Sequence, residues 1–521
     1  MLTVVFLWLM SGLTPGLTGQ ACRGHDCLQS YVARPEPSYR WEDLGQRLEG
    51  EDWTGYVVNF TSQQWLSPLL VSRTEWWHIL LIIIPHRLTV RQTGLLWITG
   101  GSNDHQGPEV DIQDPDVQMM ANIAVSNQMV TAVLFQVPNQ PIVFSEDGLQ
   151  EERKEDGIIA FTWWHFITQQ PNNPEYLLRL PMTKAAVKAM DTITYFLTDD
   201  TLPEELQALG LDPQHFIVGG ASKRGWTTWS VATVDPRVVG ILPTVMDELN
   251  FIKNIKHHWR SLGGWTWQFE DYWKLNLTTY FEEAAMQEMF DIVDSYESRE
   301  LMLMPKLVIC AANDEFFLPT DSQYWWREMP RESELNRLLF LPNSGHHYHD
   351  QLAARLGSVS SWVGQIIPGE ESPARTGEPE MPRFSWSEDS VTGDITVRSH
   401  QTSPVRVELW SAPSCSAHRR DWRAANLDSP CECGPAQDGL CLNQMSDWRA
   451  ETLQQTADNT WLAHRDPLED GRYLAFYVTL HYNISSGEAG GHLEFSTTVS
   501  VVPATFPFPD CTGEQCRGTL V

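Results

Sequence analysis

The 521-residue sequence predicts an α/β fold with a mostly parallel sheet, followed by a smaller β domain. From about residue 55 to 365, strand-like apolar runs alternate with helix-like segments, which is typical of a parallel sheet covered on both faces. A stretch rich in proline, glycine and glutamate follows at 366–382, and the runs after it are β-branched and separated by turn residues. With 42% hydrophobic residues and 23 tryptophans, the chain can bury a large core and fill two domains.

The first predicted domain, residues 22–365, contains seven apolar runs of strand length. They span residues 78–84, 94–98, 129–137, 215–218, 238–246, 306–311 and 337–341. Residues 183–197 place apolar side chains on one face at the 3.6-residue period of a helix. The segment at about 248–302 is dense in aromatic residues and is expected to be a cap inserted between two strands. Two interpretations of the cap stay open, a lid that contacts substrate and an ordinary helical insertion with its own aromatic core.

The second predicted domain, residues 383–505, has the pattern of a small β-sandwich. Its strand-like runs span residues 394–397, 405–410, 472–482 and 492–501. A cysteine-rich loop interrupts them, and a cysteine-containing tail follows at 506–521. We expect this domain to fold separately, with the linker at 366–382 as the preferred protease site.

The N-terminus predicts a secretory signal peptide over residues 1–21. An apolar stretch at 4–10 is followed by small residues, with Ala21 as one possible cleavage residue. The alternative is a signal anchor, but the apolar run is shorter than the roughly 20 residues that span a bilayer. We therefore expect a secreted, extracellular protein without a membrane span.

Eight of the nine cysteines are expected to form disulfides in an oxidising compartment. They are Cys22, Cys27, Cys415, Cys431, Cys433, Cys441, Cys511 and Cys516. Short loops favour pairing of Cys22 with Cys27 and of Cys511 with Cys516, and the pairing of the other four stays open. Cys310 lies in an apolar run and is expected to be free and buried. A zinc site is the competing interpretation of Cys431 and Cys433, but no histidine pattern accompanies them, so we expect no metal and no cofactor.

The formal net charge of −31 argues against two classes of partner, nucleic acid and anionic membrane surfaces, because both need a basic face. Three sequons, at Asn59, Asn276 and Asn483, agree with secretion and predict glycosylation.

The segment from His215 to Trp229 is the most informative stretch for chemistry. A short apolar strand runs into a turn of small residues with Ser222 at its apex, and a helix-like segment follows. This is the pattern of a nucleophile elbow, which exposes a serine hydroxyl at the top of an α/β-hydrolase-type sheet. The usual elbow is G-x-S-x-G, whereas here Arg224 stands in the second glycine position and the glycine is delayed to Gly225.

A serine nucleophile of this kind needs an acid and a histidine later in the chain. Asp314 follows the apolar run 306–311, and His346 follows the run 337–341 and a tight turn. His346 would take the proton from Ser222, and Asp314 would orient and stabilise the imidazole. Asp247, which ends a strand earlier in the chain, is the alternative acid; the competing histidines are His347 and His349.

The predicted oxyanion hole uses the backbone N–H of Lys223 and a second donor from the loop 99–102, where Gly101 is the candidate. The side chains of Lys223 and Arg224 admit two roles, binding of an anionic substrate group and a structural ion pair near the helix start.

Seven short motifs are shared with a known family. They are Gly220-Ala-Ser-Lys-Arg-Gly-Trp-Thr-Thr-Trp229, Thr61-Ser-Gln-Gln-Trp65, Gly100-Gly-Ser-Asn103, Val137-Pro-Asn-Gln-Pro141, Pro181-Met-Thr-Lys-Ala185, Asp314-Glu-Phe-Phe317 and Leu341-Pro-Asn343. In these motifs the sequence resembles the PhoPQ-activated pathogenicity-related proteins, a family that also includes secreted autocrine proliferation repressor proteins. The resemblance runs from about residue 30 to 500. It implies an α/β-hydrolase fold with a C-terminal β domain and catalytic positions at Ser222, Asp314 and His346.

Two functions remain open at this stage. The first is a secreted serine hydrolase that cleaves an ester or amide in a small-molecule or peptide substrate. The second is a non-catalytic extracellular signalling protein that keeps the hydrolase scaffold and binds a cell-surface receptor. A fold shared by esterases, peptidases and lipases identifies the reaction class only, so the substrate is not predicted.

Overall fold

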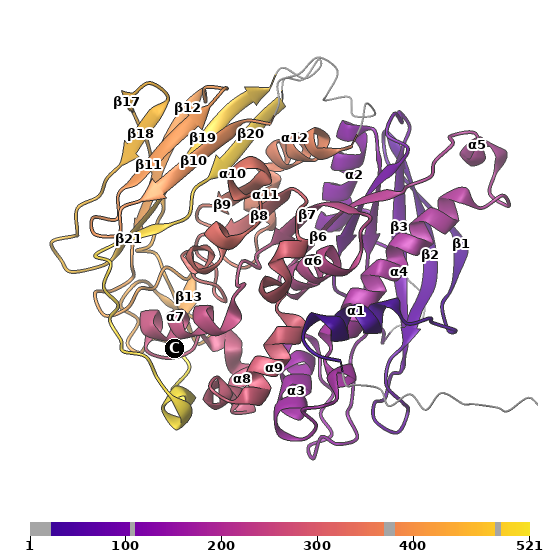
Figure 1. The fold of residues 1–521 in the computed structure, drawn as a ribbon, viewed down its shortest axis with the longest axis horizontal. Coiled ribbons are helices and arrows are strands. Elements are labelled where there is room, and N and C mark those ends of the chain that lie inside the picture. The colour runs from indigo at the N-terminus through magenta and orange to yellow at the C-terminus, as the bar shows by residue number, and fades with distance from the viewer. Residues whose placement is uncertain (1–21, 105–109, 369–380, 485–490) are drawn as a thin grey trace, which may run out of the picture.

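A 14-stranded sheet runs through the part of the chain that the computed structural model describes, which is residues 22–104, 110–368, 381–484 and 491–521 (Figure 1). Its strands follow the order β1-β2-β3-β5-β4-β6-β7-β8-β9-β20-β19-β12-β16, and β21 pairs with β19. The predicted signal peptide at 1–21 and most of the predicted linker lie outside the described residues.

Six parallel strands form the centre of this sheet. They are β4 (Thr93–Ile98), β5 (Val130–Leu134), β6 (His215–Ala221), β7 (Val238–Thr244), β8 (Lys306–Ala311) and β9 (Asn336–Leu341). Nearly all their residues are buried, which explains why they appear in the sequence as continuous apolar runs. The neighbour order β5-β4-β6, with the crossovers filled by helices, confirms the predicted α/β-hydrolase-type sheet.

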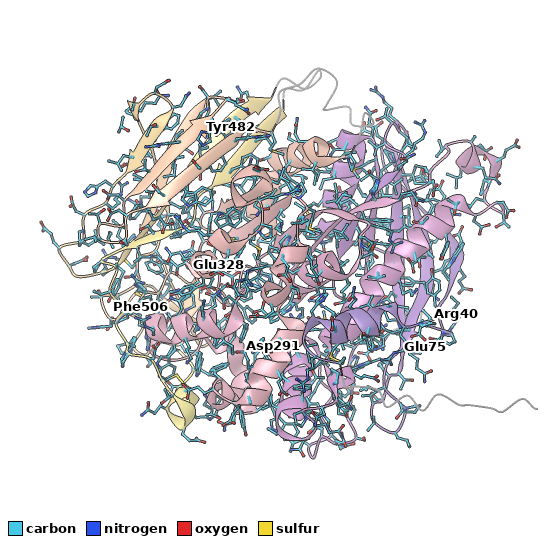
Figure 2. The ribbon with its side chains drawn as sticks, in the orientation of Figure 1. Arg40, Glu75, Asp291, Glu328, Tyr482 and Phe506 are labelled. Carbon is cyan, nitrogen blue, oxygen red and sulfur yellow. A yellow bond between two sulfur atoms is a disulfide. The ribbon has the colours of Figure 1, made fainter. Side chains whose placement is uncertain are left out.

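Three antiparallel strands extend the sheet on the N-terminal side, β1 (Arg40–Glu49), β2 (Trp53–Gln64) and β3 (Glu75–Pro85). Of these three strands only β3 is among the predicted runs. The sequence gives no strand signal for β1, because this strand is largely polar and exposed. Arg40 and Glu75, at the starts of β1 and β3, form an ion pair of 2.7 Å on this side of the molecule (Figure 2).

The sheet is covered on both faces. In β3, Leu80 and Ile82 belong to one hydrophobic cluster, while Leu81 and Ile83 belong to the other. The first cluster is built with α1 (His25–Ala33), α3 (Glu155–Thr168), α4 (Arg179–Thr198) and α6 (Lys223–Val234), and the second with α2 (Pro115–Asn127) and α12 (Leu356–Ile366). The predicted helix at 183–197 lies within α4.

The cap lies between β7 and β8, as the aromatic segment predicts. It consists of α7 (Phe251–Leu262), η2 (Trp267–Phe269), α8 (Glu270–Lys274), η3 (Leu277–Tyr280), α9 (Ala284–Val293) and η4 (Ser295–Leu301). In Figure 1, α8 and α9 lie beside α3 along the lower side of the molecule, and α7 lies next to the C-terminus. Phe251 stacks on Phe290 with ring centroids 4.3 Å apart, and Trp163 of α3 packs edge-on against both rings.

The C-terminal strands form antiparallel sheets, shown in orange and yellow in Figure 1. In the large sheet lie β12 (Arg406–Pro413), β16 (Arg449–Thr452), β19 (Leu474–Ile484), β20 (Gly491–Ser496) and β21 (Ser500–Val502). A second sheet has the order β10 (Arg383–Glu388), β11 (Ile395–His400), β18 (Thr460–Ala463), β17 (Gln455–Ala457). Ser496 of β20 pairs with Leu338 of β9, so the C-terminal strands continue the hydrolase sheet. Whether this region folds separately stays a prediction.

Shorter elements complete the described chain. They are η1 (Pro174–Tyr176), α5 (Glu204–Gln207), η5 (Asp321–Tyr324), η6 (Trp326–Glu328), α10 (Glu332–Leu335), α11 (His349–Ala353), β13 (Ala425–Asn426), β14 (Ala436–Gln437), β15 (Leu440–Leu442) and η9 (Gly513–Arg517). Among the described residues, no helix combines the length and the apolarity that crossing a membrane requires.

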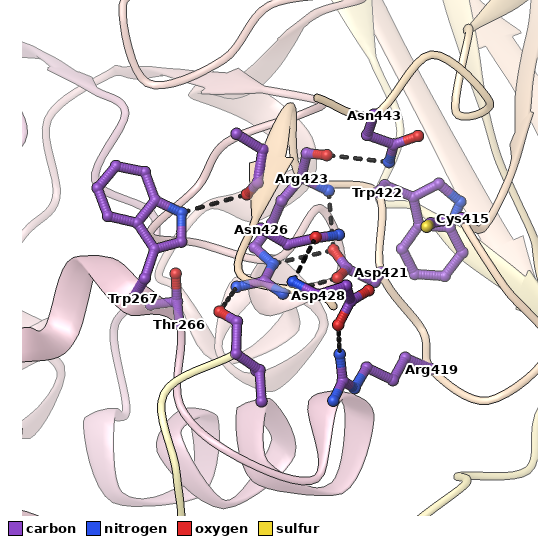
Figure 3. A network of polar contacts seen from close by, with 12 residues as sticks. Thr266, Trp267, Cys415, Arg419, Asp421, Trp422, Arg423, Asn426, Asp428 and Asn443 are labelled. Atoms are coloured by element: carbon purple, nitrogen blue, oxygen red, sulfur yellow. Dashed lines mark hydrogen bonds and ion pairs between the residues drawn. The ribbon is translucent and has the colours of Figure 1, made fainter. Parts of the chain in front are cut away.

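Four disulfides are present, Cys22–Cys27, Cys415–Cys433, Cys431–Cys441 and Cys511–Cys516, and Cys310 is free and buried. Two of these disulfides, Cys415–Cys433 and Cys431–Cys441, lie in the cysteine-rich loop, whose polar contacts join it to the cap and to the C-terminal residue (Figure 3). Arg423, which is buried, forms an ion pair of 2.7 Å with Asp421 and donates to the carbonyl of Val521 at 2.9 Å. Trp267 of the cap donates to the carbonyl of Ala425 at 3.2 Å.

Candidate active site

Ser222 lies at the turn between β6 and α6. Its backbone has φ 56° and ψ −127°, a conformation that is strained for a residue with a side chain and that is characteristic of a nucleophile elbow. The Ser222 N–H donates to the carbonyl of Thr244 at 2.9 Å, which holds the turn against β7.

Two glycines allow this tight turn. A Cβ on Gly220 would lie 2.9 Å from the carbonyl oxygen of Arg224, and a Cβ on Gly225 would lie 2.7 Å from Met246 Cβ. Gly225 therefore permits the close approach of α6 to the next strand. The displaced glycine of the sequence motif has a packing role, and Arg224 takes the place of the usual second glycine.

His346 and Asp314 come together from the ends of β9 and β8. His346 Nδ1 lies 2.9 Å from both carboxylate oxygens of Asp314, whose side chain is 2% exposed. Asp314 Oδ1 also accepts from the backbone N–H groups of Phe316 at 2.7 Å and Phe317 at 3.2 Å. Because Nδ1 faces the carboxylate, it carries the proton, and Nε2 is left as the basic nitrogen.

Glu315 helps to orient the histidine, since its Oε2 accepts from the His346 backbone N–H at 2.7 Å. The ring of Phe316 packs on the imidazole with centroids 4.6 Å apart. Burial and the charge of Asp314 raise the pKa of Glu315.

Ser222 and His346 line the same cavity of about 220 Å³, together with Thr99 and Gly100. Within the described residues, no hydrogen bond joins Ser222 to His346. In enzymes of known mechanism, the hydrogen bond between a nucleophile and its base is often long without substrate and shortens when substrate binds.

The competing residues are placed differently. His347 and His349 also line this cavity, but His349 Nε2 lies 3.5 Å from Asp116, which raises the pKa of that histidine. Asp247 makes no hydrogen bond to His346; its carboxyl interacts with the buried thiol of Cys310, and its Oδ2 has no partner. Burial, and secondly the charge of Asp314, raise the pKa of Asp247 to about 7. The carboxylate that contacts the imidazole is that of Asp314.

Backbone N–H groups are available where an oxyanion would form. Lys223 is the first residue of α6, and its N–H has no acceptor among the described residues, as is also true of Gly100 and Gly101. Gly100 lines the cavity, while Gly101 follows with φ 134° and lies against Gln136.

The side chains of Lys223 and Arg224 both form ion pairs. Lys223 Nζ lies 3.1 Å from Glu155 and 3.0 Å from Asp156, and Arg224 lies 2.6 Å from Glu155. Burial disfavours the charge on Glu155, but Arg224 and Lys223 outweigh it and hold its pKa well below the usual range. Of the two predicted roles for these cations, the structure shows the structural ion pair.

A second cavity, of about 50 Å³, adjoins Ser222 on the side of the cap. Most of its lining is aromatic or aliphatic and comes from α3, α6, the cap and the loop after β8. These residues are Trp163, Trp226, Met246, Phe251, Ile255, Phe269, Leu277, Phe281, Met286, Phe316 and Phe317. The polar lining residues are Asp156, Arg179, Lys223, Glu248, Tyr272 and Thr278.

Arg179 is a charged residue of this cavity that the sequence analysis did not single out. It is 3% exposed, its Nη1 donates to the carbonyl of Lys223 at 2.9 Å, and its guanidinium lies 4.1 Å from the ring centroid of Trp226. The sequence signal that could have revealed Arg179 is a cation inside the apolar run 177–182, because burying a charged side chain without a partner costs free energy.

One group of three side chains in the described chain could hold a metal ion, His481, His492 and Glu494, whose ligand atoms lie within 4.8 Å of one another. Two cations approach this group, because Arg355 pairs with Glu494 at 3.2 Å and Arg406 lies 3.5 Å from His481. The group lies on β19 and β20, in the antiparallel C-terminal part of the large sheet.

The sequence matches the family model described as PhoPQ-activated pathogenicity-related protein over residues 28–423. The chain belongs to this family. A relative, autocrine proliferation repressor protein A of Dictyostelium discoideum, is 31% identical over 498 residues, which cover 94% of this chain and 93% of that protein. The resemblance of the motifs is thereby confirmed.

Solved structures of esterases are also similar to this chain. Acetyl xylan esterase from Paenibacillus sp. R4 is 12% identical, with a TM-score of 0.42, covering 63% of this chain and 91% of its own. Glucuronoyl esterase from Solibacter usitatus is 12% identical, with a TM-score of 0.40, covering 64% of this chain and 91% of its own.

Proposed function

We propose that this protein is a secreted serine hydrolase that cleaves an ester or amide, with Ser222 as nucleophile, His346 as general base and Asp314 as the orienting acid. The observation that carries the proposal is the bond of His346 Nδ1 to Asp314 at 2.9 Å beside a serine held at φ 56°. An imidazole held in this tautomer presents its basic nitrogen to the cavity that Ser222 lines.

The residues allow each step of acyl transfer. Ser222 Oγ attacks the acyl carbon while its proton passes to His346 Nε2, and the carbonyl oxygen becomes an oxyanion near the Lys223 N–H. The bond to the leaving alcohol or amine then breaks, and that group takes the proton from His346. Water repeats the sequence on the acyl-enzyme, which releases the acid and restores the serine.

Secretion forms part of the proposal. It is supported by the apolar N-terminal stretch and by four disulfides, which persist in oxidising compartments. Asn483 is exposed, and Asn59 and Asn276 are half-buried, so Asn483 is the most accessible of the three proposed glycosylation sites.

The second candidate function is extracellular signalling without catalysis. The name of the Dictyostelium relative, autocrine proliferation repressor protein A, favours it. Receptor binding does not require a serine, an aspartate and a histidine in one constellation, so substitution of Ser222 separates the two functions.

Hydrolysis of 4-nitrophenyl butyrate tests the enzymatic proposal. We expect the wild type to release 4-nitrophenol and Ser222→Ala to lose this activity. Ser230→Ala is the matched control, because Ser230 lies about two turns along the helix that Ser222 precedes and its hydroxyl donates to the carbonyl of Trp226. Equal hydrolysis by wild type and Ser222→Ala would contradict the proposal. If a folded wild type is inactive and Ser222→Ala still represses proliferation, the signalling function takes its place.

A further inference from the structure

The charges around Ser222 do not balance. Lys223 and Arg224 are neutralised by Glu155 and Asp156, with all pairs at 3.1 Å or less. Arg179 adds a third cation, and no carboxylate of the described residues lies within ion-pair distance of it.

The Arg179 guanidinium is nevertheless deeply buried. Its Nε has no hydrogen-bond partner, and its one hydrogen bond to the described residues leads to the carbonyl of Lys223. Burial lowers the pKa of Arg179 to about 10, so the group remains charged at neutral pH. An isolated buried charge is expensive unless a group of opposite sign is supplied.

The acids of the same cavity do not supply that group. Asp156 is engaged, since Oδ1 accepts from the Tyr272 hydroxyl at 2.9 Å and Oδ2 lies 3.0 Å from Lys223. Burial, followed by the charges of Asp247, Asp294 and Asp314, raises the pKa of Glu248 well above its usual range, which favours the neutral form of this carboxyl.

The positions of the two cavities decide which half of a substrate meets Arg179. His346, which protonates the leaving group, lines the 220 Å³ cavity and not the aromatic one. The leaving alcohol or amine therefore lies on the His346 side, and the acyl group lies in the aromatic cavity with Arg179. A cavity of about 50 Å³ holds a few waters, so it suits a short acyl chain.

We propose that Arg179 selects substrates whose short acyl group ends in a carboxylate, as in a monoester of a small dicarboxylic acid. This inference rests on the proposed function and adds the substrate class to it. The guanidinium fork binds the free carboxylate, while Ser222 attacks the ester carbonyl at the other end of the same acyl chain.

A pair of isosteric esters tests the selection without any variant. Monoethyl succinate carries the carboxylate, and ethyl succinamate replaces it with a neutral amide. We expect wild-type kcat/KM to be at least about tenfold higher for monoethyl succinate, as for one charge-assisted contact. Equal values, or a preference for the amide, would overturn the inference while leaving the hydrolase proposal intact.

Substitutions of Arg179 test whether this residue causes the preference for the carboxylate. Arg179→Met should remove the preference, and Arg179→Lys should retain part of it, because the charge stays while the fork is lost. Arg337→Met is the matched control: Arg337 is also buried, with its pKa lowered to about 10 by burial, but it lies on β9 outside this cavity. Its ratio of the two kcat/KM values should equal that of the wild type.

Binding of the product acid separates the inference from catalysis. Calorimetric titration of Ser222→Ala with succinate and with succinamide, which carries no carboxylate, requires no turnover. Tighter binding of succinate, lost in Ser222→Ala/Arg179→Met, supports the carboxylate site even if no ester is cleaved. Indistinguishable binding of the two ligands would overturn it. Failure of the wild type to cleave either ester, with succinate still preferred, would contradict the hydrolase proposal alone.

Discussion

Replacement of Asp247 by asparagine should stabilise the protein increasingly as the pH rises. Asp247 is 3% exposed, and its pKa is raised from 3.8 to about 7, first by burial and then by Asp314. The folded protein therefore keeps a proton on Asp247 that the unfolded chain has already lost. Stability from this neutral acid is complete below pH 4 and is lost as the pH rises to about 7.

The three pKa units correspond to at most about 4 kcal/mol, at 1.36 kcal/mol per unit. For a chain of this length the entropy of unfolding is about 1 kcal/mol per degree, so the gap in Tm should grow by at most about 4 °C. Thermal unfolding of wild type and Asp247→Asn at pH 5, 6, 7 and 8 measures this gap. Asp200→Asn, at an exposed position, is the control and should show none. A gap that does not change with pH, or a loss of ester hydrolysis in Asp247→Asn, would refute the reasoning, because Asp314 is the partner of His346.

Three further outcomes follow from the same contacts. Asp314→Asn should lower kcat for ester hydrolysis by about 10³ to 10⁴ without unfolding the protein, since the His346 tautomer is no longer held; a loss below tenfold in steady-state assays would contradict that role. Ser222→Gly should be more stable than Ser222→Ala by roughly 1 kcal/mol of unfolding free energy and should have the higher Tm, because glycine relieves the strain at φ 56°. Calorimetry that finds the alanine variant more stable would argue against a strained elbow. Arg423→Ala should cost about 3 to 5 kcal/mol of unfolding free energy in thermal melts, because it leaves Asp421 buried and unpaired; a melting temperature unchanged from wild type would show that the pair contributes little.

The central strands could be predicted because a parallel sheet buried on both faces needs uninterrupted apolar runs. β1 lacks that signal, since most of its side chains are exposed or half-exposed. It is a strand because its backbone pairs with β2. The pairing of β20 with β9 was not predictable either. It rests on contact between Ser496 and Leu338, which are far apart in the sequence, and neither residue type indicates an edge to be joined.

In the site, the order of Ser222, Asp314 and His346, which follow β6, β8 and β9, could be predicted from the sequence. The choice between Asp314 and Asp247 could not, because both follow buried strands and only the folded loop directs one carboxylate to the imidazole. Arg179 was not predicted as a site residue, because a single cation on a helix usually faces solvent. Its burial depends on the packing of α4 against α6, where Trp226 covers its guanidinium.

Covalent labelling of Ser222 tests the central claim most directly. The folded wild type is treated with a fluorophosphonate, digested and mapped by mass spectrometry, with Ser222→Ala and His346→Ala treated in parallel. The account predicts one phosphonate adduct per chain, on the peptide that contains Ser222, and none in either variant. Equal labelling of Ser222→Ala, or an adduct on another residue of the wild type, would contradict it.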